Sequence, residues 1–370
     1  MKTVLVSGAG VAGLTLAYWL RRNGFAPTVV ERAPALRPGG QAVDVRGVAL
    51  DVLERTGILD EARNARTRLR GMAMLDSEGN ELWRSTEMTY SGGRLDGADI
   101  EVLREDLTRM LHRRALAEDV EFLYDDSIAT LDEQPDGVRV GFETGPARTF
   151  DLVVGADGLH SRVRRLALGP EERFASHLGS YLTVFSTDNF LDLDHWELWL
   201  KEETVGYCLY PVRDNSELRA TLGFTSEPID FDHRDLEQQK TIMADRLAHV
   251  GWETPRLLRA MREAPDFYFD AMAQIHVERW STGRVTLVGD AGYCASPLSG
   301  QGTSLALVGA YILADELGRH GDDHAAAFAR YEARMRPFAE LNQALATENP
   351  GGMPADESLE KAKNGISLDD

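Results

Sequence analysis

The sequence predicts an α/β fold in which a parallel sheet is interrupted by a second, mostly antiparallel sheet and is followed by C-terminal helices. Apolar runs typical of buried parallel strands occur near both ends of the chain, at residues 3–7 and 284–288, and each leads into glycines. Residues 180–225 differ, because they hold short, aromatic-rich runs typical of antiparallel strands. We therefore expect the two outer segments to share one sheet and the middle segment to form another.

The first outer segment has the pattern of a βαβ unit. Residues 3–7 are the first predicted strand, a helix follows as far as Arg22, and residues 27–31 are the second strand. The turn between strand and helix must be tight, must let the backbone approach a pyrophosphate and must let the helix pack closely against the strand. Each of these requirements leaves no room for a Cβ atom and so favours glycine. This Rossmann-type turn contains Gly8, Gly10, Ala12 and Gly13.

Glu31 ends the second predicted strand, where an acidic residue has a specific use. A carboxylate at this position can accept hydrogen bonds from the 2′- and 3′-hydroxyls of a ribose. The same carboxylate would repel a 2′-phosphate because the two charges are alike. The sequence therefore predicts a bound adenosine that is not of the NADP type.

The second glycine-rich segment indicates a longer ligand than a nicotinamide dinucleotide. The strand at 284–288 continues into Gly289 and Asp290, and a helix begins near Thr303. Asp290 can hold a hydroxyl of a ribityl chain, and the unpaired N–H groups of the helix start would stabilise the negative charge of a reduced flavin. Together the two segments predict bound FAD. Further residues expected beside the flavin are Pro297, Gly300 and Gly302.

Asp157 and two arginines are further candidates for the cofactor site. Asp157 follows a predicted buried strand and so lies on the ligand-facing edge of the sheet, although it could equally cap the helix that begins near Ser161. Arg104 opens an amphipathic helix, where a cation opposes the helix dipole, so we expect it to be exposed or paired with a phosphate or a flavin edge. Arg46, just before another predicted helix, invites the same argument.

Composition and charge disfavour several classes of function. The chain has 370 residues, enough for two domains, and its net charge of −20 disfavours binding to nucleic acid and to anionic membranes. The only cysteines are Cys208 and Cys294, whose spacing indicates no metal site. No run of residues is apolar and long enough to span a bilayer. We expect a cytoplasmic enzyme, monomeric or weakly dimeric, that acts on a small molecule.

The change in sequence texture predicts where the domains begin and end. We expect an FAD-binding domain at 1–175 and 277–320, a hairpin near 70–100 that joins the substrate domain, a substrate domain at 176–276, a C-terminal helix at 321–346 and a disordered tail at 347–370.

These spaced motifs together resemble those of the class A flavoprotein monooxygenases, the FAD-dependent aromatic hydroxylases typified by para-hydroxybenzoate hydroxylase. The resemblance covers nearly all of residues 1–345 and is closer to the branch that tailors antibiotics or modifies tetracyclines. Ser304 stands where many members have asparagine. The motifs that carry the resemblance are the glycine turn with Glu31 and Arg32, Asp157-Gly158, and Gly289-Asp290 with Pro297 and Gly300-Gln301-Gly302.

The resemblance implies a role for each matched residue. It implies that Gly8, Gly10, Gly13 and Glu31 hold the ADP part of FAD, with Arg32 near the adenosine. Arg104 would lie at the flavin or its phosphates, and Asp157 at FAD and the passing nicotinamide cofactor. Asp290 would lie at the ribityl–pyrophosphate region, and Pro297 with the glycines after it at the isoalloxazine.

The implied reaction uses NADPH or NADH transiently to reduce FAD, and then O2. A flavin C4a-hydroperoxide would transfer one oxygen atom to a phenolic or polycyclic aromatic small molecule, and the resemblance assigns no catalytic residue. Hydroxylation, Baeyer–Villiger insertion and antibiotic inactivation all stay open. The alternatives are another flavin oxidoreductase, such as a halogenase or a reductase, and a flavin-bearing protein that binds a ligand without turnover. Residues 196–199 lack the pattern usual in halogenases.

The substrate is expected between the antiparallel sheet and the flavin. Candidates are the polar and aromatic side chains of the predicted strands, although the sequence does not tell which face of the sheet each occupies; Tyr207 and Cys208 must point to opposite faces. The substrate candidates are Tyr210, Arg213 and Phe224, followed by Tyr207 and His195.

Overall fold

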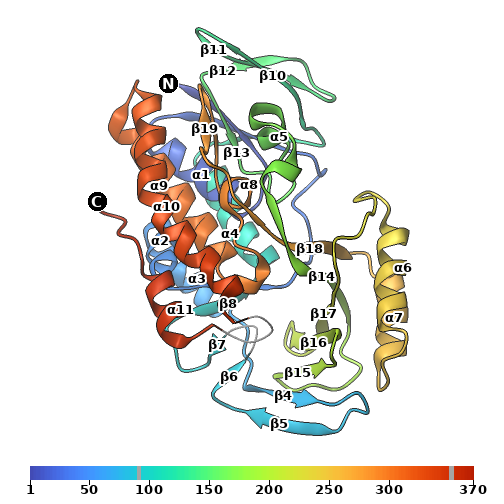
Figure 1. Ribbon diagram of the computed structural model, residues 1–370. Helices are drawn as coiled ribbons and strands as arrows, with labels where there is room; N and C mark the ends of the chain where they lie inside the picture. Colours follow the sequence, from blue (N-terminus) through green and yellow to red (C-terminus); the bar gives the residue numbers. More distant parts are fainter. Residues whose placement is uncertain (90–92, 350–353) are drawn as a thin grey trace.

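Two sheets lie side by side, with most helices on the outer side of one and a helical pair on the outer side of the other (Figure 1). The structure is a computed structural model and describes residues 1–89, 93–349 and 354–370. Residues 90–92, within the expected hairpin region, and residues 350–353, within the expected tail, lie outside the described residues.

The first sheet has six strands in the order β19-β20-β13-β1-β2-β9. All its neighbours pair in parallel except β19 and β20, which are antiparallel. The central strands are almost completely buried, which accounts for their continuous apolar runs. The strands are β1 (Thr3–Ser7), β2 (Ala26–Glu31), β9 (Glu121–Tyr124), β13 (Leu152–Gly155), β19 (Ser281–Thr282) and β20 (Val285–Leu287).

The two ends of the chain meet in this sheet through β13. Val153 pairs with Leu5 of β1 on one side and with Val285 of β20 on the other. Helix α1 (Val11–Arg22) packs closely against helix α9 (Gly302–His320), so the helices that follow the two glycine-rich segments are neighbours. The predicted α/β arrangement is present, and the observed β20 is slightly shorter than the run at 284–288.

The remaining elements of this layer cover the sheet and connect to its edges. The helices are α2 (Val48–Thr56), α3 (Leu59–Asn64), α4 (Arg104–Ala117), α5 (Arg162–Leu168), α8 (Asp290–Tyr293), α10 (His324–Glu348) and the short 3₁₀ turns Glu171–Arg173 and Pro297–Ser299. The small sheets are made of β3 (Ala42–Val45) with β8 (Ile100–Leu103), β6 (Met88–Thr89) with β7 (Gly93–Arg94), and β10 (Ile128–Gln134), β11 (Gly137–Phe142) and β12 (Arg148–Phe150).

The second sheet has seven strands in the order β18-β14-β17-β16-β15-β4-β5. Its neighbours are antiparallel apart from β15 and β4, which run in parallel with Trp196 opposite Gly71. The early hairpin thereby becomes the edge of a sheet whose other strands come much later. The strands are β4 (Gly71–Leu75), β5 (Glu81–Ser85), β14 (Ala175–Asp188), β15 (Trp196–Lys201), β16 (Val205–Val212), β17 (Glu217–Thr225) and β18 (Tyr268–Ile275).

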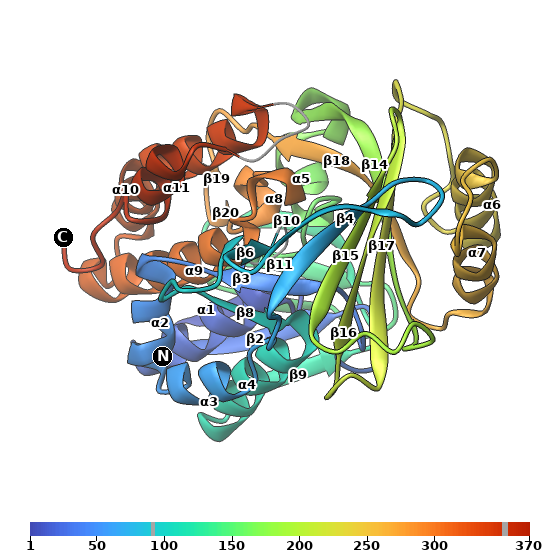
Figure 2. The ribbon, with the colours of Figure 1, turned by 90° about the horizontal axis from the view of Figure 1, so that it is seen from below.

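The two faces of the seven-stranded sheet pack against different partners (Figure 2). One face forms an apolar core with helices α6 (Leu236–Leu247) and α7 (Thr254–Glu263). The other face contributes Cys208 and Tyr210 to a smaller cluster with Leu103 of β8. We call this second face the inner face, because it points toward the six-stranded sheet.

The C-terminal segment is folded, contrary to the expectation of a disordered tail. Residues Asp356–Lys363 form helix α11, which packs against α10. Ala362 and Leu368 are buried. The few apolar residues of the segment are spaced so that they meet an existing core, which composition alone does not reveal.

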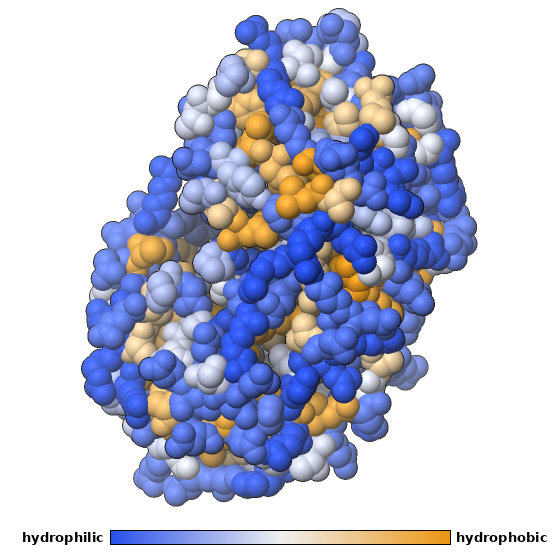
Figure 3. Space-filling model, turned by 180° about the vertical axis from the view of Figure 1, so that it is seen from behind, coloured by the Kyte–Doolittle hydropathy of each residue, from blue (hydrophilic) through white to orange (hydrophobic). Residues whose placement is uncertain are grey.

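No helix within the described residues has the length and apolar character needed to cross a membrane. The face seen from behind is mostly hydrophilic, with hydrophobic residues gathered in separate patches (Figure 3).

Candidate cofactor site

The first glycine turn has the tight geometry that the sequence predicts. A Cβ on Gly8, whose φ is +106°, would lie 2.6 Å from the carbonyl oxygen of Ala156, and a Cβ on Gly13 would lie 1.9 Å from the carbonyl oxygen of Gly8. Both contacts are impossible, so strand, turn and helix require glycine there. A Cβ on Gly10, in contrast, would meet no atom of the described residues within 4 Å. The space in front of the first turn of α1 is therefore open to a ligand.

Glu31 lies beside this turn at the end of β2. Its carboxylate accepts hydrogen bonds from the backbone N–H groups of Ala9, at 2.8 Å, and of Ala33, at 3.0 Å. Each oxygen has a second lone pair, so the carboxylate can still accept from ribose hydroxyls. The neighbouring Arg32 is exposed.

The second glycine segment lies directly against the first. Gly289, with φ of +65°, would place a Cβ 3.0 Å from the Cβ of Ala12 in α1. Asp290 follows at the start of α8, and burial raises the pKa of its carboxyl group. A Cβ on Gly302 would lie 3.9 Å from Oδ1 of Asp290. The glycines of both ends of the chain and this half-buried acid thus share one edge of the sheet.

The start of helix α9 carries an unusual buried amide. Gln301 is the N-cap residue, yet its side chain makes no capping hydrogen bond. Both its amide nitrogen and its amide oxygen are buried without a partner among the described residues. Such a group costs free energy unless something pairs with it, so the site fits a polar ligand at this helix start. Pro297 begins the 3₁₀ turn just before it, and Gly300 has φ of +63°.

Arg46 connects this loop to the small β3–β8 sheet. Its backbone N–H donates to Oγ of Ser304 over 3.1 Å, and its buried guanidinium forms an ion pair of 2.8 Å with Asp44. A Cβ on Gly300 would lie 3.6 Å from that guanidinium. Burial raises the pKa of Asp44 to about 7 against the opposing charge of Arg46, and Glu101, which lies opposite on β8, adds to the rise.

Arg104 is half-buried and has a partner within the chain. Its guanidinium donates to the carbonyl oxygen of Gly39 over 2.9 Å, and burial lowers its pKa. Arg219 of β17, which the sequence reasoning missed, donates to the carbonyl oxygen of Gly40 over 3.1 Å and is itself buried. Two cations from different elements therefore hold the loop at residues 39–40. An arginine in an alternating strand pattern carries no sign that it will point inward.

The carboxylate of Asp157 makes most of its hydrogen bonds with groups of the protein itself. Its carboxylate accepts from the backbone N–H groups of Arg162, at 2.9 Å, and Val163, at 3.1 Å, and from the hydroxyls of Ser7 and Ser161. Asp157 thus organises the start of α5 and joins it to the end of β1, which is the capping role that we considered as an alternative.

The expected substrate residues are divided between the two faces of the seven-stranded sheet. Tyr210 is on the inner face, and its hydroxyl accepts from the backbone N–H of Ala42 over 2.8 Å. Phe224 and Tyr207 lie in the core with α6 and α7, so the expectation that Phe224 lines the pocket is wrong. Because side chains alternate along a strand, each one must lie on one of the two faces of the sheet. The sequence did not show that helices cover one of these faces.

Arg213 and His195 lie at the ends of strands rather than on a face. Arg213 is exposed, has a positive φ of +53°, and forms ion pairs with Glu105 and Asp106 of α4, the pair with Asp106 measuring 2.8 Å. His195 precedes β15 with φ of +60°, and its ring lies 3.7 Å from a carboxylate oxygen of Asp194. Arg213 thus ties the second sheet to α4.

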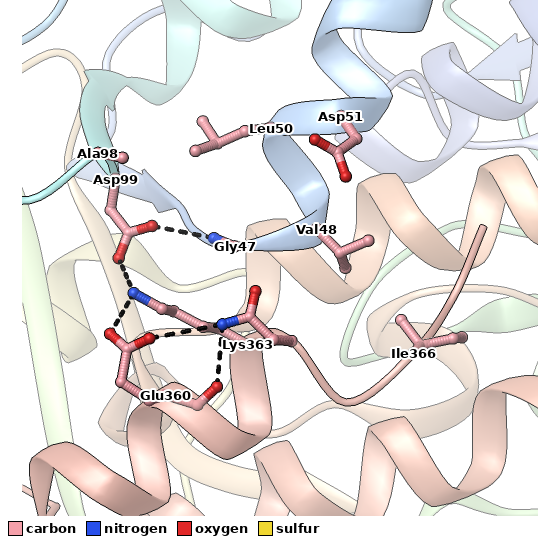
Figure 4. A pocket seen from close by; sticks show the side chains of 10 residues that line it. Gly47, Val48, Leu50, Asp51, Ala98, Asp99, Glu360, Lys363 and Ile366 are labelled. Atoms are coloured by element: carbon pink, nitrogen blue, oxygen red, sulfur yellow. Dashed lines mark hydrogen bonds and ion pairs between the residues drawn. The ribbon is translucent and has the colours of Figure 1, made fainter.

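A cavity of about 440 Å³ lies beside Gly47, where α2 begins next to Arg46. Lys363 of α11 donates to Asp99 over 2.9 Å, and the other oxygen of Asp99 accepts from the backbone N–H of Gly47 over 2.9 Å (Figure 4). Lys363 also pairs with Glu360. The C-terminal helix is therefore fastened to the loop that precedes α2.

Comparison with known proteins places the chain in a family. Residues 1–346 match the model of the FAD binding domain family. The chain is 54% identical to the uncharacterized protein Rv1260 of Mycobacterium tuberculosis, with 100% of both chains covered. It is 42% identical to a flavin-dependent monooxygenase of an unknown prokaryotic organism, over 97% of this chain and 92% of the relative.

A solved structure agrees with the fold. The crystal structure of tetracycline destructase Tet(51) superimposes with a TM-score of 0.90 at 35% identity, covering 100% of this chain and 99% of the other. The buried, unpaired amide of Gln301 and the open space at Gly10 fit the cofactor that this family binds. The chain belongs to the class A flavoprotein monooxygenases and is an FAD-dependent monooxygenase.

Proposed function

We propose that this enzyme uses NADPH or NADH and O2 to insert one oxygen atom into a phenolic or polycyclic aromatic small molecule. The observation that carries the proposal is the contact between Gly289 and Ala12, which brings both glycine segments and the starts of α1 and α9 to one edge of the sheet. A ligand with a pyrophosphate at one end and a redox ring at the other suits that arrangement.

The residues divide the work of holding FAD, which when bound supplies the redox chemistry and the reaction with O2. The turn at Gly8, Gly10 and Gly13 would hold the pyrophosphate against the start of α1, and Glu31 would hold the ribose. Asp290 and Gln301 would hold the ribityl and flavin end. The backbone N–H groups at the start of α9 would stabilise negative charge on the reduced ring.

The substrate would bind against the inner face of the seven-stranded sheet. Trp199 and Tyr210 contribute to the apolar cluster on this face, and Arg219 on the neighbouring strand is buried. Flat apolar rings with a few fixed polar groups suit an aromatic substrate, and the buried surroundings would exclude water. We propose that residues 176–276, together with the hairpin of β4 and β5, form the substrate-binding part of the chain.

Tetracyclines are the first compounds to test. Tet(51) carries the name tetracycline destructase and resembles this chain along its whole length, which supports a fused-ring substrate here. The experiment measures NADPH and NADH consumption by the holoenzyme with tetracyclines and with simpler phenols. The expected result is faster consumption with at least one compound and a product heavier by one oxygen atom.

Two variants on opposite faces of the sheet test the position of the substrate. Trp199→Phe should raise KM, because Trp199 packs on the inner face, whereas Phe224→Leu should leave KM unchanged, because Phe224 lies behind the sheet. Equal effects of both on KM would contradict the proposed position. If neither nicotinamide reduces the bound flavin anaerobically with any compound present, the proposed reaction is wrong.

A further inference from the structure

Three side chains with metal-binding atoms meet on the outer edge of the seven-stranded sheet. His160 follows β13, Asp270 belongs to β18, and His233 lies in the loop between β17 and α6. Their ligand atoms all lie within 4.8 Å of one another. The spacing of the cysteines indicated no metal site, and these three residues are distant in the chain, where no short motif contains them.

Two of the three ligand atoms are already close to the separation that a metal ion would impose. Nε2 of His160 lies 3.0 Å and 3.1 Å from the carboxylate oxygens of Asp270. A Zn²⁺ ion with ligands at about 2.0 to 2.2 Å in tetrahedral geometry places neighbouring ligand atoms about 3.3 to 3.6 Å apart, so the pair would separate by a few tenths of an ångström to admit the ion. A hydrogen bond now joins this pair, so the two ligand atoms already face each other in the folded protein.

An outer layer of hydrogen bonds orients these two ligands. Nδ1 of His160 is 2.8 Å from Oε1 of Glu171, and the buried Arg164 donates to the other oxygen of Glu171 over 2.7 Å. The hydroxyl of Tyr268 donates to Asp270 over 3.0 Å. A carboxylate behind the imidazole is the arrangement that fixes metal-binding histidines in proteins.

His233 is available as the third ligand. Its ring stands 4.4 Å from that of His160 and 4.5 Å from that of Phe231, centroid to centroid. Within the described part of the chain the His233 ring makes ring contacts but no hydrogen bond. The residue is exposed on a loop, so a small movement of that loop can bring its nitrogen to an ion held by the other two.

We propose that His160, His233 and Asp270 form a binding site for a first-row divalent transition metal ion such as Zn²⁺. Two imidazoles and one carboxylate suit zinc and its neighbours, whereas Mg²⁺ and Ca²⁺ prefer all-oxygen sites. The ion takes the place of the proton between His160 and Asp270, and that proton is released to solvent. Because His160 follows β13 of the six-stranded sheet and Asp270 belongs to β18 of the seven-stranded sheet, the ion would hold the two layers together.

Isothermal titration of the metal-stripped holoenzyme, without a histidine tag, with ZnCl2 tests the site. The expected result is one saturable site per chain. His233→Gln removes an exposed ligand without disturbing the core. Loss of an outer hydrogen-bond partner weakens metal binding by roughly 10- to 100-fold, and loss of the ligand His233 should weaken zinc binding by more than that. Glu171→Gln should weaken binding by about 10- to 100-fold.

A surface histidine–carboxylate pair provides the matched control. His249 lies 3.2 Å from a carboxylate oxygen of Glu202, and the described residues offer this pair no third ligand atom, so His249→Gln should leave zinc binding unchanged. Zinc should also raise the Tm of the wild type but not of His233→Gln, because only the folded wild type has the site. No saturable binding by the wild type, or equal binding by His233→Gln and the wild type, would overturn the proposal.

Discussion

Gly289 and Ala12 come from opposite ends of the chain and touch where the two glycine-rich segments meet. A Cβ on Gly289 would lie 3.0 Å from that of Ala12, and the φ of Gly289 is +65°. The close approach brings the starts of helices α1 and α9 together, so one cofactor can reach both.

Gly289→Ala should reduce FAD content, because its methyl group would push α1 away from the second segment. The positive φ alone costs about 1 to 2 kcal/mol. Gly24→Ala is the control, because Gly24 has φ of +85° but a Cβ there meets no described atom within 4 Å. Thermal unfolding and the visible absorbance of bound flavin would measure both variants. Equal FAD content in the two would show that the contact with Ala12 is unimportant.

Asp290→Ala should lose FAD while keeping the fold. Asp290 is a half-buried carboxylate whose pKa is raised by desolvation, so its removal relieves the apoprotein of a costly group. Loss of a hydrogen bond to a charged group, about 1.5 to 3 kcal/mol, predicts FAD binding weaker by about 10- to 100-fold. Flavin fluorescence titration and circular dichroism are the measurements.

Asp157→Ala provides the contrast to Asp290→Ala. Asp157 accepts hydrogen bonds from the backbone of α5, so its loss should lower the Tm of the apoprotein. If Asp290→Ala keeps full FAD affinity, Asp290 does not hold the cofactor.

Asp44 should make stability depend on pH. Its pKa is raised from 3.8 to about 7, so the folded state disfavours the charge, and stability is lost as pH rises from about 4 to about 7. Asp44→Asn removes this loss, so the Tm of the variant relative to wild type should be higher at about pH 8 than at about pH 4.5. The exposed Asp132, changed to asparagine, should show no such difference. A pH-independent effect of Asp44→Asn would contradict the assignment.

Lys363→Ala should release helix α11. The ion pair with Asp99 is partly buried, and its loss should cost about 1 to 3 kcal/mol locally. Hydrogen exchange of residues 356–363 should therefore become faster. Lys361→Ala, on the exposed side of the same helix, should leave exchange unchanged. Similar exchange in both variants would mean that the apolar contacts of Ala362 and Leu368 hold the segment alone.

The sequence was informative wherever backbone geometry restricts the residue type. Gly8 and Gly13 have no room for a Cβ, so only glycine fits at these positions and the turn could be predicted from the sequence. The position of Asp290, directly after a buried strand, follows from the sequence in the same way, whereas its role in holding the cofactor stays a prediction.

The sequence was less informative wherever the partner lies far away in the chain. Which side chains of β17 point inward depends on α6 and α7, because these helices cover the other face of the sheet and make Phe224 a core residue. The inward direction of Arg219 depends on the loop at Gly40. The meeting of His160 with His233 depends on how the two sheets are placed. Alternation limits each side chain to two directions, and only tertiary packing chooses between them.

The parallel pairing of β15 with β4 also bears on how the protein is made. Strand β4 leaves the ribosome with β5 as a lone hairpin, and such a hairpin is at best marginally stable in water. Its five residues are fully buried in the finished enzyme, so they stay exposed until β15 and its neighbours have been synthesised. During that interval the nascent chain offers an unpaired, apolar strand edge to other chains. Slow synthesis of the stretch between β5 and β15 would lengthen the period in which the protein is most prone to aggregate.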